Sequence, residues 1–302
     1  MSHVDFCGLR LAHPIVNGSG TFDAIAAREA FGEALAEAFP FAAFVSKTIT
    51  LEPRAGNPPP RLWEAPAGLI NSIGLPNKGL RRYMEEDLPQ LTGYRSDASV
   101  SAAGESLPVP LITNVMGSTA GELAELVRAC EEQAGIAAIE LNVSCPNVET
   151  GLDIGADPQQ LRAVVTELRP LTGKPLIVKL TPNAADVPAC ALAAQEGGAD
   201  AVSLINTLRA MALVPGGRPG EAWLGGGTGG LSGPAIRHVA LAQVAAVARR
   251  VDVPVVGMGG LQTAAHARQM LDAGATLVAL GTESFRDPAA GSRVAAGVLA
   301  SS

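Results

Sequence analysis

The sequence lacks any long apolar run. No stretch of about 18 apolar residues is present and residues 1–5 are mostly polar, so neither a membrane-spanning helix nor a secretory signal is predicted. An excess of basic charge is also missing, because 22 Lys and Arg stand against 29 Asp and Glu, with a formal net charge of -7. With no basic stripe either, we expect no nucleic-acid partner and no membrane partner.

Cysteine is scarce and scattered. The four cysteines (Cys7, Cys130, Cys145 and Cys190) form no C-x-x-C pair. This pattern fits the reducing cytoplasm better than a secreted fold held by disulfides. It also argues against a structural zinc site or an iron–sulfur cluster held by this chain alone. We therefore expect a cytoplasmic protein with no metal of its own.

What the sequence does contain is a series of eight short apolar runs, each ending in Gly, Ser, Asn, Lys or Cys. Most are β-branched and lack internal polar residues, as expected for strands buried on both faces of a parallel sheet. These predicted strands lie at residues 14–16, 43–46, 111–115, 136–141, 176–180, 201–205, 253–256 and 277–280.

Helical patterns separate the later runs. The clearest begins with Asp157-Pro158, a capping residue followed by proline in the first turn. The alternation of strand and helix predicts an α/β fold, a single-domain (β/α)8 barrel (TIM barrel) over residues 1–302 with extended βα loops. A doubly wound sheet is the alternative. The predicted helices lie at residues 120–133, 157–168, 184–196, 234–250 and 264–273.

Three segments interrupt this alternation. Residues 50–78 are rich in Pro and Gly and too long for an ordinary βα loop, which indicates a lid or a substrate loop. Residues 211–230 form a second long segment that contains three consecutive glycines. Residues 96–106 are rich in Ser and Ala, and we expect a mobile surface connection there.

Glycines follow the last two predicted strands. One run continues into residues 257–260, with three glycines, and the other into Gly281-Thr282, while Ser232-Gly233 precedes another helix. Glycines let the backbone approach an anion closely, and helix N-termini offer free N–H groups. The loops after strands seven and eight bind phosphate in many barrels. A phosphate site is therefore predicted, with simple tight turns as the alternative.

Two lysines also lie at strand ends, Lys47 and Lys179. Lysine is rarely buried unpaired, so each is expected to face a ligand, a carboxylate in a structural ion pair, or a substrate carbonyl as a Schiff-base nucleophile. Amides cluster at similar positions and suit a planar ligand rich in imide and carboxylate groups, although each one alone is also a common turn residue. These amides are Asn71, Asn114, Asn142, Asn147 and Asn206.

The segment after the fourth predicted strand carries a thiol. Cys145 stands beside Ser144 and between Asn142 and Asn147. A lone cysteine is more often an inert buried residue. Its position at a strand end, where barrels carry out catalysis, makes Cys145 the predicted catalytic group.

Taken together and in this order, the motifs resemble the class 1 dihydroorotate dehydrogenases, which are FMN enzymes of pyrimidine biosynthesis. The resemblance implies a (β/α)8 barrel holding FMN over its C-terminal face. The motifs that carry it are Gly18-Ser19-Gly20-Thr21-Phe22, Ser46-Lys47-Thr48, Asn71-Ser72-Ile73-Gly74-Leu75, Thr113-Asn114, Asn142-Val143-Ser144-Cys145-Pro146-Asn147, Val178-Lys179-Leu180, Asn206-Thr207, Gly229-Gly230-Leu231-Ser232-Gly233, residues 257–260 and Gly281-Thr282.

The resemblance also implies roles for individual residues. Cys145 is expected to remove the C5 proton of (S)-dihydroorotate while hydride passes from C6 to N5 of FMN, giving orotate. Lys47 is expected to touch both molecules, since a cation stabilises the reduced anionic flavin. The implied substrate residues are Lys47, Asn71, Ser72, Ile73, Gly74, Leu75, Asn142, Asn206 and Thr207. The implied FMN residues are Ser19, Lys47, Thr48, Asn114, Asn142, Lys179, Ile205, Gly233, Gly259, Gly260, Gly281 and Thr282.

Two features of the sequence distinguish between the classes of dihydroorotate dehydrogenase. The related membrane-bound class 2 enzymes use serine as the base and carry an N-terminal helical extension, whereas this chain has Cys145 and begins close to its first predicted strand. Residues 206–212 and 228–234 are similar to the class 1B type. That type implies a homodimer core in a heterotetramer with a second subunit, which carries FAD and a 2Fe-2S cluster and passes electrons to NAD. Departures from the pattern are Asp23-Ala24 and residues 96–106 and 216–227.

Other functions are compatible with these motifs. A fumarate-dependent class 1A dihydroorotate dehydrogenase needs no partner subunit. A dihydropyrimidine dehydrogenase subunit has the same flavin barrel and cysteine base. A Schiff-base lysine aldolase shares only the barrel, which alone does not fix function. A catalytically inactive barrel that serves as a binding subunit is disfavoured by the presence of Cys145 and both lysines.

Overall fold

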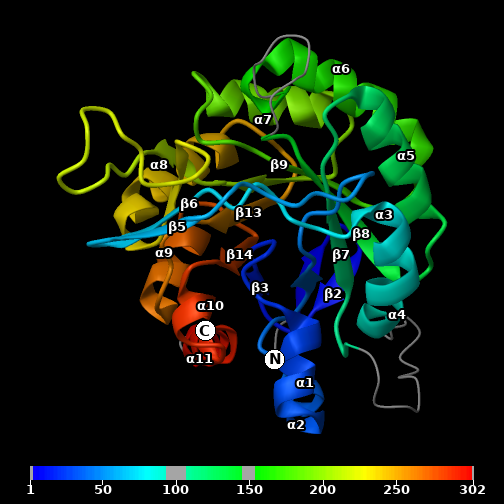
Figure 1. The fold of residues 1–302 in the computed structure, drawn as a ribbon. Coiled ribbons are helices and arrows are strands. Elements are labelled where there is room, and N and C mark those ends of the chain that lie inside the picture. The colour runs from blue at the N-terminus through cyan, green and yellow to red at the C-terminus, as the bar shows by residue number, and fades with distance from the viewer. Residues whose placement is uncertain (1–2, 93–106, 145–153, 301–302) are drawn as a thin grey trace.

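Eight parallel strands form the central sheet of the computed structural model, which describes residues 3–92, 107–144 and 154–300. The strands follow one another around the sheet nearly in chain order (Figure 1). All eight strands predicted from the sequence are confirmed. In spatial order they are β3 (Ile15–Asn17), β14 (Leu277–Leu280), β13 (Val255–Met258), β10 (Ala201–Leu204), β9 (Leu176–Lys179), β8 (Ile136–Asn142), β7 (Leu111–Val115) and β4 (Phe44–Val45).

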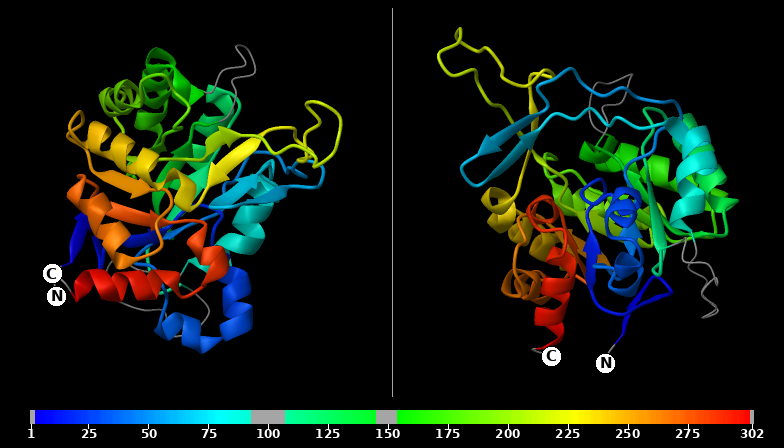
Figure 2. Two further views of the ribbon diagram at one scale, coloured as in Figure 1. Left: turned by 90° about the vertical axis from the view of Figure 1, so that its left-hand side faces the viewer. Right: turned by 60° about the horizontal axis from the view of Figure 1, so that its bottom comes forward.

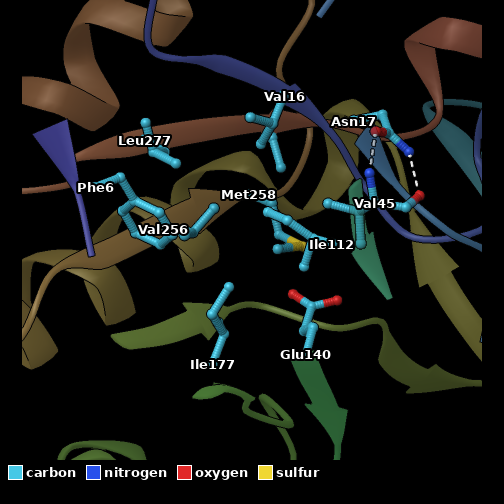
Figure 3. A pocket seen from close by; sticks show the side chains of 11 residues that line it. Phe6, Val16, Asn17, Val45, Ile112, Glu140, Ile177, Val256, Met258 and Leu277 are labelled. Atoms are coloured by element: carbon cyan, nitrogen blue, oxygen red, sulfur yellow. Dashed lines mark hydrogen bonds between the residues drawn. The ribbon is translucent and has the colours of Figure 1, made fainter. Parts of the chain in front are cut away.

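The two end strands, β3 and β4, meet and close the barrel. Ala42 donates its backbone N–H to the Ile15 carbonyl at 2.9 Å. Further along the two strands, the side-chain amide of Asn17 takes the place of backbone hydrogen bonds between them. It bonds to both the N–H and the carbonyl of Val45 (Figure 3). The fold is therefore the predicted (β/α)8 barrel, and the doubly wound alternative is wrong.

Helices surround the barrel (Figure 1). Four of them begin directly after a capping residue, since the side chains of Thr119, Asp157, Asp186 and Thr263 accept hydrogen bonds from N–H groups of the first turn. The predicted helix at 184–196 starts later, at the residue after its cap. The outer helices are α5 (Ala120–Glu131), α6 (Pro158–Leu168), α7 (Val187–Glu196), α8 (Arg237–Ala248), α9 (Ala264–Asp272) and α11 (Ala290–Leu299).

Short helices fill the remaining connections, and several were not predicted. The predicted helix at 234–250 is a 3-10 turn, Pro234–Ile236, followed by α8. Others are α1 (Ala24–Phe31), α2 (Glu33–Glu37), α3 (Gly79–Arg82), a π-helical turn (Tyr83–Asp87), α4 (Leu88–Leu91), 3-10 turns at Ile154–Ala156 and Arg169–Leu171, and α10 (Glu283–Arg286).

An N-terminal hairpin covers the end of the barrel where the strands begin. Strands β1 (Val4–Phe6) and β2 (Leu9–Leu11) pair antiparallel. Phe6 is fully buried, and its ring lies beside Leu277 and Val256 inside the barrel (Figure 3). This end is therefore filled by apolar side chains, which leaves the opposite end for the polar strand termini.

The predicted loop at 50–78 contains two strands, and two more strands flank the predicted loop at 211–230, the second of them overlapping its last two residues. They form a four-stranded antiparallel sheet in the order β11 (Leu208–Ala210), β12 (Gly229–Ser232), β6 (Gly68–Asn71), β5 (Leu62–Ala65). The connection between β11 and β12 extends away from the barrel (Figure 2). Since this sheet follows the ends of β4 and β10, it stands over the polar end of the barrel. The segment at residues 96–106, predicted as a surface connection, lies outside the described residues.

Candidate active site

The interior of the barrel is built in layers. Ile112, Glu140 and Ile177 line a small cavity inside it, each from a different strand (Figure 3). Side chains two residues apart on a strand share a face. Asn114, Asn142 and Lys179 therefore face the interior one layer closer to the strand ends, and all three are buried. Their strands are neighbours in the sheet, with Asn142 directly paired to Lys179.

The β3 and β4 ends come together beside this layer. The Ser19 hydroxyl donates to the Ser46 carbonyl at 2.7 Å and lies 3.4 Å from the Thr48 hydroxyl. A Cβ placed on Gly20 would lie 3.8 Å from Nζ of Lys47. The structure thus gathers the residues that the two motifs predicted for the flavin.

Lys47 keeps solvent-exposed surface, yet enough protein surrounds its ammonium that desolvation lowers its pKa, while Asp23 acts in the opposite direction. Asp23 also caps α1 by accepting from the N–H groups of Ile25 and Ala26. The unusual Asp23-Ala24 pair is therefore a helix start. Within residues 3–92, 107–144 and 154–300, neither Lys47 nor Lys179 forms an ion pair.

The glycines predicted to hold a phosphate meet at one place. Gly233 and Gly260 have φ angles of 90° and 68°, where glycine is favoured. A Cβ on Gly260 would lie 2.7 Å from the carbonyl oxygen of Gly233, and a Cβ on Gly233 would lie 3.5 Å from the Thr282 methyl group. The Thr282 hydroxyl donates to the Ser232 hydroxyl at 2.9 Å. The loops after β12, β13 and β14 therefore form one small-residue cradle, which also includes Gly259 and Gly281.

The antiparallel sheet brings a second set of predicted residues together. The Asn71 amide donates to the Gly230 carbonyl at 3.1 Å. A Cβ on Gly230 would come 1.9 Å from the Thr207 hydroxyl, so Thr207 lies against the same glycine. Asn206, just after β10, donates to the Ser144 hydroxyl at 3.0 Å. This set thus joins the ends of β6, β8 and β10.

The loop after β6 is held by its own hydrogen bonds. The buried Ser72 hydroxyl donates to the Thr228 carbonyl at 2.8 Å, and Asn57 donates its backbone N–H to the Ile73 carbonyl at 3.0 Å. Gly74 and Leu75 both have positive φ, at 74° and 53°. The Ser72 side chain and the Ile73 carbonyl are therefore engaged within the protein.

Cys145, the predicted base, and Asn147 lie outside the described residues. The nearest described position is Ser144, whose backbone N–H bonds to Oδ1 of Asn142 at 3.3 Å. Ile205 is buried directly beyond β10. Asn142 and Asn206 thus both bond to Ser144, the last described residue before this gap.

Sequence reasoning missed three buried polar residues inside the barrel: Asn17, Glu140 and Ser203. Glu140 accepts a hydrogen bond from the Asn114 amide nitrogen and another from the Ser203 hydroxyl, the latter at 2.7 Å. A signal was available for Glu140, because it is the charged residue within the otherwise apolar run at 136–141. Ser203, within the run at 201–205, and Asn17, directly after the run at 14–16, carried a similar but weaker signal because both are uncharged.

Comparison with known proteins identifies the family. The family model described as dihydroorotate dehydrogenase matches residues 1–301. The chain belongs to this family. The catalytic subunit of dihydroorotate dehydrogenase B (NAD(+)) from Desulforudis audaxviator is 43 % identical over 298 residues, which cover 97 % of this chain and 90 % of that protein. The protein of the same name from Pelobacter propionicus is 42 % identical over 299 residues, covering 98 % and 91 %.

A third relative carries a different class name. The Solibacter usitatus protein is 41 % identical over 293 residues, covering 96 % of this chain and 89 % of its own length, and is provisionally named dihydroorotate dehydrogenase A (fumarate). Family membership confirms the resemblance inferred from the motifs. The protein is an oxidoreductase that oxidises dihydroorotate in pyrimidine biosynthesis, and the aldolase and dihydropyrimidine dehydrogenase alternatives are set aside. In the part of the chain that the structure describes, no helix has the length and apolar character needed to cross a membrane.

Proposed function

We propose that this chain is the FMN-binding catalytic subunit of a class 1B dihydroorotate dehydrogenase, with Cys145 as the base. The observation that carries the proposal is the convergence of Asn114, Asn142 and Lys179 above the apolar barrel interior. Relatives with the class B name support the choice of class.

The described residues fit FMN on two counts. The cradle of small residues around Gly233, Gly260 and Thr282 leaves backbone close to any bound anion, as a phosphate requires. Oδ1 of Asn114 is buried and accepts no hydrogen bond from any residue in the described ranges, so it suits a donor group of a bound ring. When bound, FMN supplies the acceptor for a hydride.

Different residues would hold different parts of FMN. Gly233, Gly259, Gly260, Gly281 and Thr282 would surround its phosphate. Ser19, Lys47, Thr48, Asn114, Asn142, Lys179 and Ile205 would line the rest. In its protonated form, Lys47 would favour negative charge on the ring beside it.

Substrate binding is assigned to the amides and backbone over the strand ends. Asn71, Asn142, Asn206 and Thr207, together with Lys47 and the backbone of residues 72–75, would hold the carboxylate and imide groups of dihydroorotate. Asn71 and Asn206 each donate one N–H to the protein, so a second N–H and the amide oxygen of each would be available to a ligand. Cys145, as thiolate, would take the C5 proton.

A partner subunit completes the proposal. It would carry FAD and the 2Fe-2S cluster and deliver electrons to NAD, with two copies of this chain at the centre of a heterotetramer in the cytoplasm. The scattered cysteines leave cluster chemistry to the partner. The relative with the class A name supports fumarate as the alternative acceptor.

FMN binding by the isolated chain tests the cofactor. The purified protein should be yellow, and acid treatment should release free FMN. A matched variant, Gly260→Val, should lose FMN because its side chain would enter the cradle beside Gly233. A wild-type protein that stays colourless after incubation with FMN would refute the proposal.

A further inference from the structure

Glu140 is a buried acid that the proposed reaction does not use. Its side chain lies inside the barrel among apolar neighbours that include Ile112 and Ile177 (Figure 3). A carboxylate in such surroundings needs hydrogen-bond donors to offset its lost hydration. Two are present, the Asn114 amide nitrogen from β7 and the Ser203 hydroxyl from β10.

The contact with Glu140 sets the direction of the Asn114 amide. A carboxylate only accepts hydrogen bonds, so the Asn114 NH2 group must face Glu140 and its Oδ1 must face elsewhere. The backbone of Asn114 is also fixed, since its N–H bonds to the Ser46 hydroxyl at 3.0 Å. Without Glu140, the amide is free to turn about its last bond and exchange donor for acceptor.

Oδ1 of Asn114 lies in the part of the barrel proposed to hold the flavin. Asn114 follows Ile112 by two residues, so it faces the interior beyond the cavity, and it lies in register with Glu140, two residues before Asn142 on the neighbouring strand. Its Oδ1 is buried and has no hydrogen-bond donor among the described residues. A buried unpaired acceptor is unfavourable unless a ligand supplies the donor, such as a ring N–H.

We propose that Glu140 is a positioning residue for FMN, which holds the Asn114 amide so that Oδ1 is presented to the ring as an acceptor. This inference rests on the proposed FMN function. It assigns Glu140 no contact with the substrate or with the flavin, and its effect passes through Asn114.

The test is a double-mutant cycle on FMN affinity, measured by quenching of FMN fluorescence when apoprotein is added. Asn114→Ala and Glu140→Met should each weaken binding about tenfold, the effect of one buried hydrogen bond. The double variant should bind about as well as Asn114→Ala alone, because Glu140 has then lost the group it positions. Losses that multiply to about a hundredfold, or wild-type affinity in Glu140→Met, would overturn the inference.

Two further variants accompany the cycle, one as a second test and one as a control. Glu140→Gln keeps an oxygen for Asn114 and donates its NH2 to Ser203, so its affinity should stay within about threefold of wild type. A tenfold loss there would overturn the inference, and this arm remains decisive if Glu140→Met does not fold. Thr113→Val is the matched control. Thr113 directly precedes Asn114 in β7, and the substitution removes its buried hydrogen bond with the Tyr83 hydroxyl, which is 3.0 Å long.

The outcome of the control and that of the wild type separate the explanations. Thr113→Val should keep FMN affinity, and a tenfold loss there would show that any damage to β7 has the same effect, against the inference. Failure of the wild-type protein to bind FMN would instead refute the proposed function itself. Binding by wild type with independent losses at 114 and 140 would refute only the role of Glu140.

Discussion

The side-chain amide of Asn17 bonds to both backbone polar groups of Val45, donating Nδ2 to the carbonyl and accepting the N–H on Oδ1, each at 2.8 Å. Strand β4 is only two residues long, and this amide supplies the ladder that the backbone does not. Because Asn17 precedes Ser19 and Val45 precedes Lys47, the same contact sets the spacing of two motifs assigned to the flavin.

Asn17→Ala should destabilise the protein. Both polar groups of Val45 would be left buried without partners, which costs about 2–4 kcal/mol in unfolding free energy, measured by urea denaturation of the apoprotein. Asn17→Asp should lose a similar amount, because a carboxylate oxygen would face the Val45 carbonyl. Wild-type stability in both variants would show that the amide does not close the barrel.

Replacing the proposed base should slow the chemistry and leave binding intact. Cys145→Ala should reduce flavin reduction by dihydroorotate on the order of 10²–10⁴-fold, while orotate should still perturb the flavin spectrum. Ser144→Ala is the comparison at the neighbouring residue: it removes the hydroxyl bonded to Asn206 but not the proposed base, so it should slow flavin reduction much less than Cys145→Ala does. If Cys145→Ala reduces its flavin at a normal rate and Ser144→Ala does not, the base is Ser144.

The same reaction should depend on pH through the thiol. A cysteine has an ordinary pKa of about 8.5 and acts as its thiolate, so the wild-type rate should rise from neutral to alkaline pH. Cys145→Ser should keep some activity only at still higher pH, because a hydroxyl is a far weaker acid. The measurement is anaerobic stopped-flow flavin reduction across pH, and a flat wild-type profile contradicts a thiolate base.

Lys47→Met should separate stability from function. Desolvation lowers the pKa of Lys47, so its charged form is disfavoured by folding, despite the opposing attraction of Asp23. The folded protein therefore sheds this proton more readily than the unfolded chain, and wild-type stability should rise relative to Lys47→Met as pH increases through that lowered pKa. At neutral pH, the apo variant should be at least as stable as wild type in thermal unfolding, yet reduce its flavin more slowly. A variant that loses stability at pH 7 would contradict this assignment.

The electron acceptor that this chain uses would distinguish between class B and class A, the two classes named among its relatives. The chain by itself should reduce artificial dyes with dihydroorotate but should not reduce NAD. Co-expression with an FAD and 2Fe-2S subunit should restore NAD reduction. Efficient fumarate reduction by the isolated chain would assign it to class A instead.

Most of the barrel could be predicted because a local sequence pattern marks each of its strands. The run at 277–280 is continuous and apolar and lies between Thr276 and Gly281, so length and composition identify it. Strand β13 was placed two residues early, since Pro254 has no N–H to give to the ladder and the strand begins after it. Helix α1 was missed, although Asp23 is a capping residue, because that pair was judged only as a departure from a family motif.

The antiparallel sheet and the barrel closure were not predictable from local pattern. β6 pairs with β12 across more than half of the chain, and Asn71 meets Gly230 only through that pairing. The partnership of Asn17 with Val45 likewise depends on how the first and second strands meet. The amides and lysines could be named because polar residues at strand ends are conspicuous, whereas their mutual contacts required the folded chain.

The account's central claim is that this chain passes hydride from dihydroorotate to a bound FMN. The most direct measurement mixes the FMN-loaded protein with (S)-dihydroorotate without oxygen and follows flavin absorbance together with orotate formation. The account predicts that the flavin bleaches and that orotate appears in equal amount. A flavin that dithionite reduces but dihydroorotate leaves oxidised would contradict it.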